Sequence, residues 1–123
     1  MRRLATALLA AVSLSGCDAG PEGPGSLEAR ATGEALGAVV LEVEGPGIRG
    51  FTGRGETRVY SAPVPGRPDV HRVVLLDPVG GTLGFAIDVD DVGMHGPFFR
   101  VVSAASTSNA LLLVPRVEVS IER

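Results

Sequence analysis

Residues 39–47 are Val39-Val40-Leu41-Glu42-Val43-Glu44-Gly45-Pro46-Gly47. The odd-numbered positions from 39 to 43 are all apolar, whereas the even-numbered positions include both glutamates. This period of two is typical of a β-strand with one buried face and one face in water. The Gly-Pro-Gly stretch ends the strand, because proline has no N–H to donate to a neighbouring strand. We therefore predict an amphipathic strand here, with Glu42 and Glu44 on its wet face.

The same alternation occurs at residues 117–122, where Val, Val and Ile alternate with Glu, Ser and Glu. Between these two strands we expect strands at about 56–61, 69–77, 82–91 and 97–106, separated by stretches rich in Gly and Pro. The apolar runs 73–76 and 111–114 are expected in central strands covered on both faces, with a bulge or strand break at Pro115.

The composition favours a single small domain built from short strands. The chain has 123 residues, of which 45% are hydrophobic and only 4% aromatic, and it contains 17 Gly and 9 Pro. No segment has a sustained helical period. A short helix competes only at residues 26–36, where we expect a strand or an irregular lead-in. The predicted fold class is an all-β antiparallel sandwich.

Two stretches carry a resemblance to a known family. Residues 37–48 (Gly37 to Ile48) and 82–89 (Thr82 to Val89) are similar to small immunoglobulin-like sandwiches of the cohesin type, over about residues 37–121. The resemblance also extends to short uncharacterised lipoproteins of environmental bacteria. It implies an immunoglobulin-like antiparallel β-sandwich. No residue-by-residue motif carries the dockerin binding of cohesins across to this chain.

The N-terminal segment has the pattern of a secretory signal peptide. Arg2 and Arg3 form a positive region, and residues 4–14 form an apolar run too short to span a bilayer as a stable helix. The run ends in Leu14-Ser15-Gly16-Cys17, which resembles the lipobox of bacterial lipoproteins. The resemblance implies cleavage before Cys17 and acylation of its thiol. The alternative is ordinary secretion, with Cys17 as a free thiol.

These features divide the chain into three parts. We expect a lipoprotein signal peptide at residues 1–16, a lipidated Cys17 with a flexible Gly- and Pro-rich linker at residues 17–26, and a β-sandwich domain at residues 27–123. The acylated Cys17 would bind membrane lipid, since two or more acyl chains anchor a protein stably. The expected location is the bacterial cell envelope, on the periplasmic or outer face of a membrane.

Charge and aromatic content argue against two classes of ligand. Eleven basic residues stand against fourteen acidic ones, a net charge of −3, so we expect no nucleic-acid partner. The chain has no Trp and one tyrosine, Tyr60, so sugar or base stacking on aromatic side chains has no support.

The acidic group Asp88, Asp90 and Asp91 is the one candidate for calcium. The simpler interpretation places Asp88 and Asp90 on the solvated face of a strand and Asp91 in the following turn. The distal glutamate of an EF-hand loop is missing. We expect no metal site and no cofactor.

Catalytic motifs are similarly weak. His71 and His95 have no second ligand at a short spacing that would favour zinc. Residues 103–109 are rich in Ser but lack a Gly-x-Ser-x-Gly motif, and they favour a strand end followed by a turn. The glycines between Gly45 and Gly55 lack the Lys and the following helix of a phosphate loop, and are interpreted as turn and bulge glycines.

The sequence therefore predicts a membrane-anchored envelope protein with a non-catalytic module for protein interaction or a structural role. Binding would use a sheet face or an exposed edge strand. Two alternatives remain open. One is an enzyme or enzyme subunit using His71, Asp88 and His95, and the other is a small-ligand carrier with an opening interior.

Overall fold

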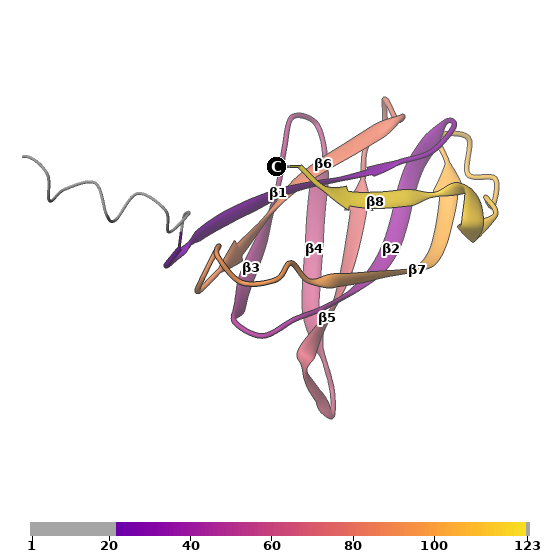
Figure 1. The fold of residues 1–123 in the computed structure, drawn as a ribbon. Helices are drawn as coiled ribbons and strands as arrows, with labels where there is room; N and C mark the ends of the chain where they lie inside the picture. The colour runs from indigo at the N-terminus through magenta and orange to yellow at the C-terminus, as the bar shows by residue number, and fades with distance from the viewer. Residues whose placement is uncertain (1–21, 123) are drawn as a thin grey trace, which may run out of the picture.

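The computed structural model describes residues 22–122, which form a sandwich of two antiparallel four-stranded β-sheets (Figure 1). The signal peptide, Cys17 and linker residues 17–21 predicted from the sequence lie outside the described residues. No helix in the described part of the chain has the length and apolarity needed to cross a membrane. The strands are β1 (Gly25–Thr32), β2 (Leu36–Glu44), β3 (Ile48–Gly53), β4 (Arg58–Val64), β5 (Arg67–Leu76), β6 (Thr82–Val89), β7 (Phe98–Ser106) and β8 (Glu118–Ile121).

Sheet I has the strand order β3-β6-β1-β8. Its longest pairing joins β1 to β6, with Gly25 opposite Val89 and Thr32 opposite Thr82. Strand β8 covers only the second half of β1, from Ala29 to Thr32.

Sheet II has the strand order β4-β5-β2-β7. Strand β2 is central and pairs with β5 on one side and β7 on the other, while β4 and β5 form a hairpin. Gly66, at the tip of that hairpin, has φ +79°, a conformation that favours glycine.

The core lies between the two sheets and follows the period-two pattern of the strands. In β2 the alternating Val39, Leu41 and Val43 are fully buried, and in β6 the alternating Leu83, Phe85 and Ile87 are fully buried. Phe85 packs edge-on against Phe99 of the opposite sheet, with ring centroids 6.4 Å apart. The all-β sandwich predicted from the sequence is confirmed.

The predicted strands at 56–61, 69–77, 82–91 and 97–106 correspond to β4 to β7. At residues 26–36 the chain is a strand followed by a turn, and β1 begins at Gly25. The last two residues of the expected linker, Gly25 and Ser26, therefore pair with Val89 and Asp88 of β6.

The prediction of a central strand at residues 111–114 is wrong. Leu111 makes only an isolated bridge to Ala105, and a 3₁₀ turn follows at η2 (Val114–Arg116). Leu111 and Leu113 are 85% and 65% exposed. The segment connects β7 of sheet II to β8 of sheet I, and Pro115 has no N–H with which to extend a ladder.

The prediction for residues 73–76 is only half right. Val73 and Leu75 are fully buried in the core, as expected. Val74 and Leu76 lie on the outer side of sheet II, where Val74 is half-buried and Leu76 is 38% exposed. Within the described residues no second layer covers this outer face, so an apolar surface remains on it.

Candidate functional site

The outer face of sheet II combines apolar and basic side chains in three successive rows that span all four strands, beyond which lie Val70, Glu44 and the exposed Phe98. Each row joins residues that are partners across β4, β5, β2 and β7, and successive rows are two residues apart along β2. The first row is Arg58, Leu76, Ala38 and Ala105; the second is Tyr60, Val74, Val40 and Ser103; the third is Ala62, Arg72, Glu42 and Arg100.

Three residues of the third row and the neighbouring Arg67 of β5 form a cluster of three arginines around one glutamate, which we call the arginine cluster (Glu42, Arg67, Arg72 and Arg100). Arg100 donates from Nε and Nη2 to Oε1 of Glu42, at 3.3 and 2.9 Å. Arg67 donates from Nη1 to the same oxygen at 3.3 Å, and Arg72 donates from Nη2 to Oε2. Both oxygens of the carboxylate are therefore engaged.

Burial and charge differ sharply within the arginine cluster. The Glu42 side chain is only 5% exposed, whereas those of Arg67, Arg72 and Arg100 are 50%, 49% and 64% exposed. The hydrogen bonds from Arg72 and Arg100 lower the pKa of Glu42 to about 2, so the carboxylate is charged at neutral pH. Three positive charges against one negative leave the cluster net positive and open to water.

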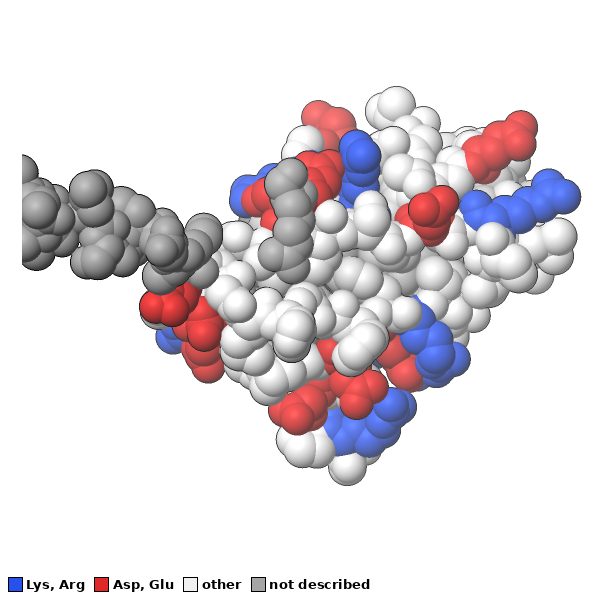
Figure 2. Space-filling model, in the orientation of Figure 1, with Lys and Arg blue, Asp and Glu red and all other residues white. Residues whose placement is uncertain are grey.

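The sequence prediction that Glu42 lies in water is therefore wrong. The strand alternation correctly assigns Glu42 to the outer face, but the arginines on both neighbouring strands bury it. Figure 2 shows acidic and basic side chains side by side over the β4–β5 hairpin, at the lower end of the molecule in that view.

The second row forms an apolar strip (Tyr60, Val74 and Val40). Val40 and Val74 are half-buried, whereas Tyr60 is 57% exposed on the edge strand β4. An exposed tyrosine beside aliphatic side chains is typical of protein interfaces, where its ring is buried and its hydroxyl keeps a polar partner.

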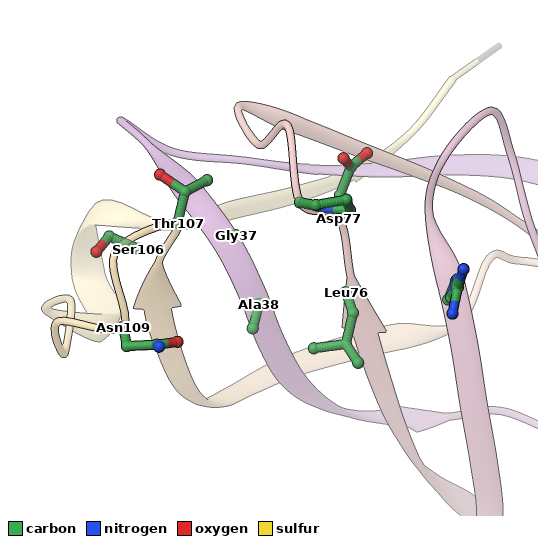
Figure 3. A pocket seen from close by; sticks show the side chains of 9 residues that line it. Gly37, Ala38, Leu76, Asp77, Ser106, Thr107 and Asn109 are labelled. Atoms are coloured by element: carbon green, nitrogen blue, oxygen red, sulfur yellow. The ribbon is translucent and has the colours of Figure 1, made fainter.

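At the end of the sheet beyond this strip is a surface hollow of roughly 390 Å³. Figure 3 shows Leu76 and Asp77 on one side of β2 and Ser106, Thr107 and Asn109 on the other, with Gly37 and Ala38 between them. Gly37 is required here, because a Cβ would lie 2.8 Å from the Cα of Thr107. Arg58 also lines the hollow, and among the described residues it makes no ion pair.

Asp77 stabilises the loop beside this hollow. Its Oδ1 accepts hydrogen bonds from the N–H groups of Val79 and Gly80, and its Oδ2 accepts one from the Thr57 hydroxyl. Burial alone would raise the pKa of Asp77, but these three hydrogen bonds outweigh it and lower the pKa. Asp77 thus holds the β5–β6 turn.

The outer face of sheet I differs, because its arginines are matched one to one by acids. Arg54 pairs with Glu28 at 2.7 Å and Arg30 pairs with Glu122 at 3.3 Å. All four side chains are about half exposed. Paired, exposed charges of this kind contribute little energy and form an ordinary solvated surface.

The acidic residues considered for calcium each have a separate protein partner. Asp88 accepts a hydrogen bond from Ser26, Asp90 pairs with Arg49, and Asp91 accepts from the N–H groups of Gly23 and Gly93. The backbone hydrogen bonds from Gly93 and Gly23 lower the pKa of Asp91. Among residues 22–122, no group of three or more His, Cys, Asp or Glu side chains is arranged to hold a metal.

The structure does not bring His71, Asp88 and His95 together. His71 lies on the inner side of sheet II, opposite Val43, with its ring edge-on to Phe51 and its buried Nδ1 without a partner. Asp88 lies on the outer side of sheet I, and His95 is exposed in the loop before β7.

The interpretation of residues 103–109 is confirmed, whereas that of the glycines between Gly45 and Gly55 is confirmed only in part. Residues 103–109 form the end of β7 and a turn, in which Ser106 Oγ accepts hydrogen bonds from the N–H groups of Ser108 and Ala110. Gly47 and Gly55 have positive φ in turns, and a register shift occurs between Ile48 and Gly50, but Gly50 and Gly53 lie within strand β3 and pair with β6.

The arginine cluster was missed by sequence reasoning. Arg67, Arg72 and Arg100 are 25, 30 and 58 residues from Glu42 along the chain. The only available signal was a glutamate in the middle of a strongly apolar strand, which favours a basic partner on an adjacent strand.

No family model matches the chain, and the searches of curated proteins and of solved structures found no match.

Proposed function

We propose that this protein is an envelope lipoprotein, anchored through an acylated Cys17, whose β-sandwich is a non-catalytic module that binds a partner protein through the outer face of sheet II. The observation that carries the proposal is that face itself. It presents an apolar strip with an exposed tyrosine, bounded by exposed arginines, and the described residues leave it uncovered.

The anchoring part of the proposal rests on Leu14-Ser15-Gly16-Cys17 and the apolar run before it. The chain enters the domain at β1, which belongs to sheet I. A tether joined to sheet I leaves the outer face of sheet II, on the opposite side of the sandwich, free for a partner. Gly23 is hydrogen-bonded to Asp91 and Val92 of the domain, so the free tether runs from Cys17 to Gly23 and reaches about 20–22 Å at most when fully extended.

Intact-mass spectrometry of the membrane fraction tests the anchor. In cells producing the wild-type chain, we expect loss of residues 1–16 and a mass increase of two or three acyl chains at Cys17. The Cys17→Ala variant should lack this increase and leave the membrane fraction. An unmodified wild-type chain would contradict the anchor.

Site-specific photo-crosslinking in intact cells tests the binding face. A photoreactive amino acid at position 60 should give a reproducible crosslinked protein band. The same amino acid at Thr52, an exposed residue of β3 opposite Ala86 in sheet I, is the matched control and should give none. Equal crosslinking from both positions, or none from position 60, would contradict this use of the face.

A further inference from the structure

The charge of the outer face of sheet II is opposite to that of the whole chain. Arg58, Arg67, Arg72 and Arg100 lie on this face, against the carboxylates of Glu42 and Glu44. The chain as a whole has a net charge of −3. A partner that is electrostatically complementary to this face is acidic.

The arginine cluster is oriented before any partner arrives. Glu42 fixes three guanidinium groups through hydrogen bonds, and each guanidinium has five N–H donors, so most donors of Arg67 and Arg72 still face solvent. A guanidinium fork matches a carboxylate in a bidentate geometry. Because the buried Glu42 already holds the side chains in place, less conformational entropy is lost when a second carboxylate binds.

The rows set a spacing for the ligand. Ala38, Val40 and Glu42 mark the three rows on β2, and two strand residues span about 6.6 Å. Measured along the strand direction, the row of Arg58 and the row of the arginine cluster therefore lie about 13 Å apart, with the apolar strip midway. An extended peptide repeats its side chains on one face at the same interval. Acidic residues at positions i and i+4, with an apolar residue at i+2, match these three rows.

We propose that the outer face of sheet II binds an extended acidic segment of the partner protein, with two carboxylates four residues apart and an apolar side chain between them. This inference rests on the proposed function and adds the chemistry of the partner. A protein segment is favoured over an anionic membrane because the apolar strip offers little surface for insertion into a bilayer: Val40 and Val74 are half-buried, and only Tyr60 is exposed. Glu44 on the same face would also repel an anionic bilayer.

Nuclear magnetic resonance titration of the full-length protein in non-ionic detergent tests the inference. The probe is the synthetic peptide Ser-Glu-Ser-Leu-Ser-Glu-Ser with blocked ends. One control peptide has the same composition with the two glutamates adjacent, and a second has lysines in place of the glutamates. We expect shifts of amide signals in β2, β4, β5 and β7, with binding about threefold or more tighter than for either control.

Substitutions of single arginines test which side chains contact the acidic peptide. Arg58→Gln leaves the arginine cluster intact and should weaken binding of the acidic peptide by about threefold, as should Arg100→Gln. Arg54→Gln, which removes the arginine that follows β3 and pairs with Glu28 on sheet I, should leave binding unchanged. Raising the salt concentration should weaken binding, since the contacts are partly exposed.

Three results would overturn the inference: equal binding of the lysine peptide, shifts confined to sheet I, or binding of phosphatidylglycerol vesicles through sheet II without binding of the acidic peptide. If one of these results is obtained but position 60 still gives a crosslink, the proposed binding face stands. Only the proposal of an acidic partner segment is then overturned. If position 60 gives no crosslink and the acidic peptide also fails to bind, the proposed function is removed as well.

Discussion

Replacing Phe85 by alanine is expected to lower the free energy of unfolding by about 3–5 kcal/mol. Phe85 is fully buried in β6, which pairs with both β1 and β3. Its ring also packs edge-on against Phe99 of sheet II, so the substitution removes a contact between the two sheets and leaves a cavity in the core. A domain of this size has a total stability of about 5–15 kcal/mol, so much of the stability would be lost.

Urea unfolding followed by circular dichroism measures this change. Phe98→Ala is the matched control, because Phe98 is also in β7 beside the core residue Phe99 but is 79% exposed. We expect the control to change stability by no more than about 0.5 kcal/mol. Equal losses in the two variants would mean that Phe85 does not occupy the core as described.

Replacing Glu42 by glutamine is expected to lower the free energy of unfolding at neutral pH. It is also expected to make that free energy depend less steeply on pH in the acid range. Hydrogen bonds from Arg72 and Arg100 hold the pKa of Glu42 at about 2, below its usual value of 4.5. Between pH 4.5 and pH 2 the unfolded chain therefore binds more protons at this position than the folded chain does. The stabilisation by Glu42 is complete above pH 4.5 and is lost as the pH falls through 2.

Thermal unfolding at several pH values tests this expectation. The wild type should lose stability from pH 5 to pH 2 more steeply than Glu42→Gln, and the two should converge near pH 2. The lowered pKa values of Asp77 and Asp91 act in the same direction, so the difference between wild type and variant isolates Glu42. At neutral pH the variant leaves three adjacent arginines without their counter-charge, which is destabilising, although solvent screens part of the effect because the guanidinium groups are about half exposed.

Glu28→Gln provides the control with similar chemistry. A hydrogen bond from Arg54 lowers the pKa of Glu28, but both side chains are about half exposed and the pair is screened by solvent. This variant should follow the wild-type pH curve closely. A Glu42→Gln curve parallel to the wild-type curve would contradict the stabilising role of the arginine cluster.

Local patterns in the sequence were sufficient to predict most of the fold. Alternation at residues 39–44 and 117–122 identified strands and their buried faces, because side chains on a strand point alternately to its two sides. Continuous apolar runs were less informative. Residues 73–76 form a strand with one uncovered face, and Leu111 and Leu113 are exposed in a connecting segment. An apolar run without alternation does not indicate which of its sides are covered.

The β3 strand was not predicted either. Residues 48–53 contain two glycines, and the sequence favoured turns and bulges throughout this stretch. Pairing with β6 holds the segment extended despite its low strand propensity, with Phe51 opposite Ile87.

The sequence by itself determined the all-β class, the faces of the amphipathic strands and the positions of the main turns, since these follow from the chemistry of residues adjacent in the chain. Only the tertiary structure decided that Glu42 is buried among three arginines and that Tyr60, Val74 and Val40 form one strip. Strand order and register bring these residues together. Both depend on packing between segments tens of residues apart, which the local period of a single strand does not encode.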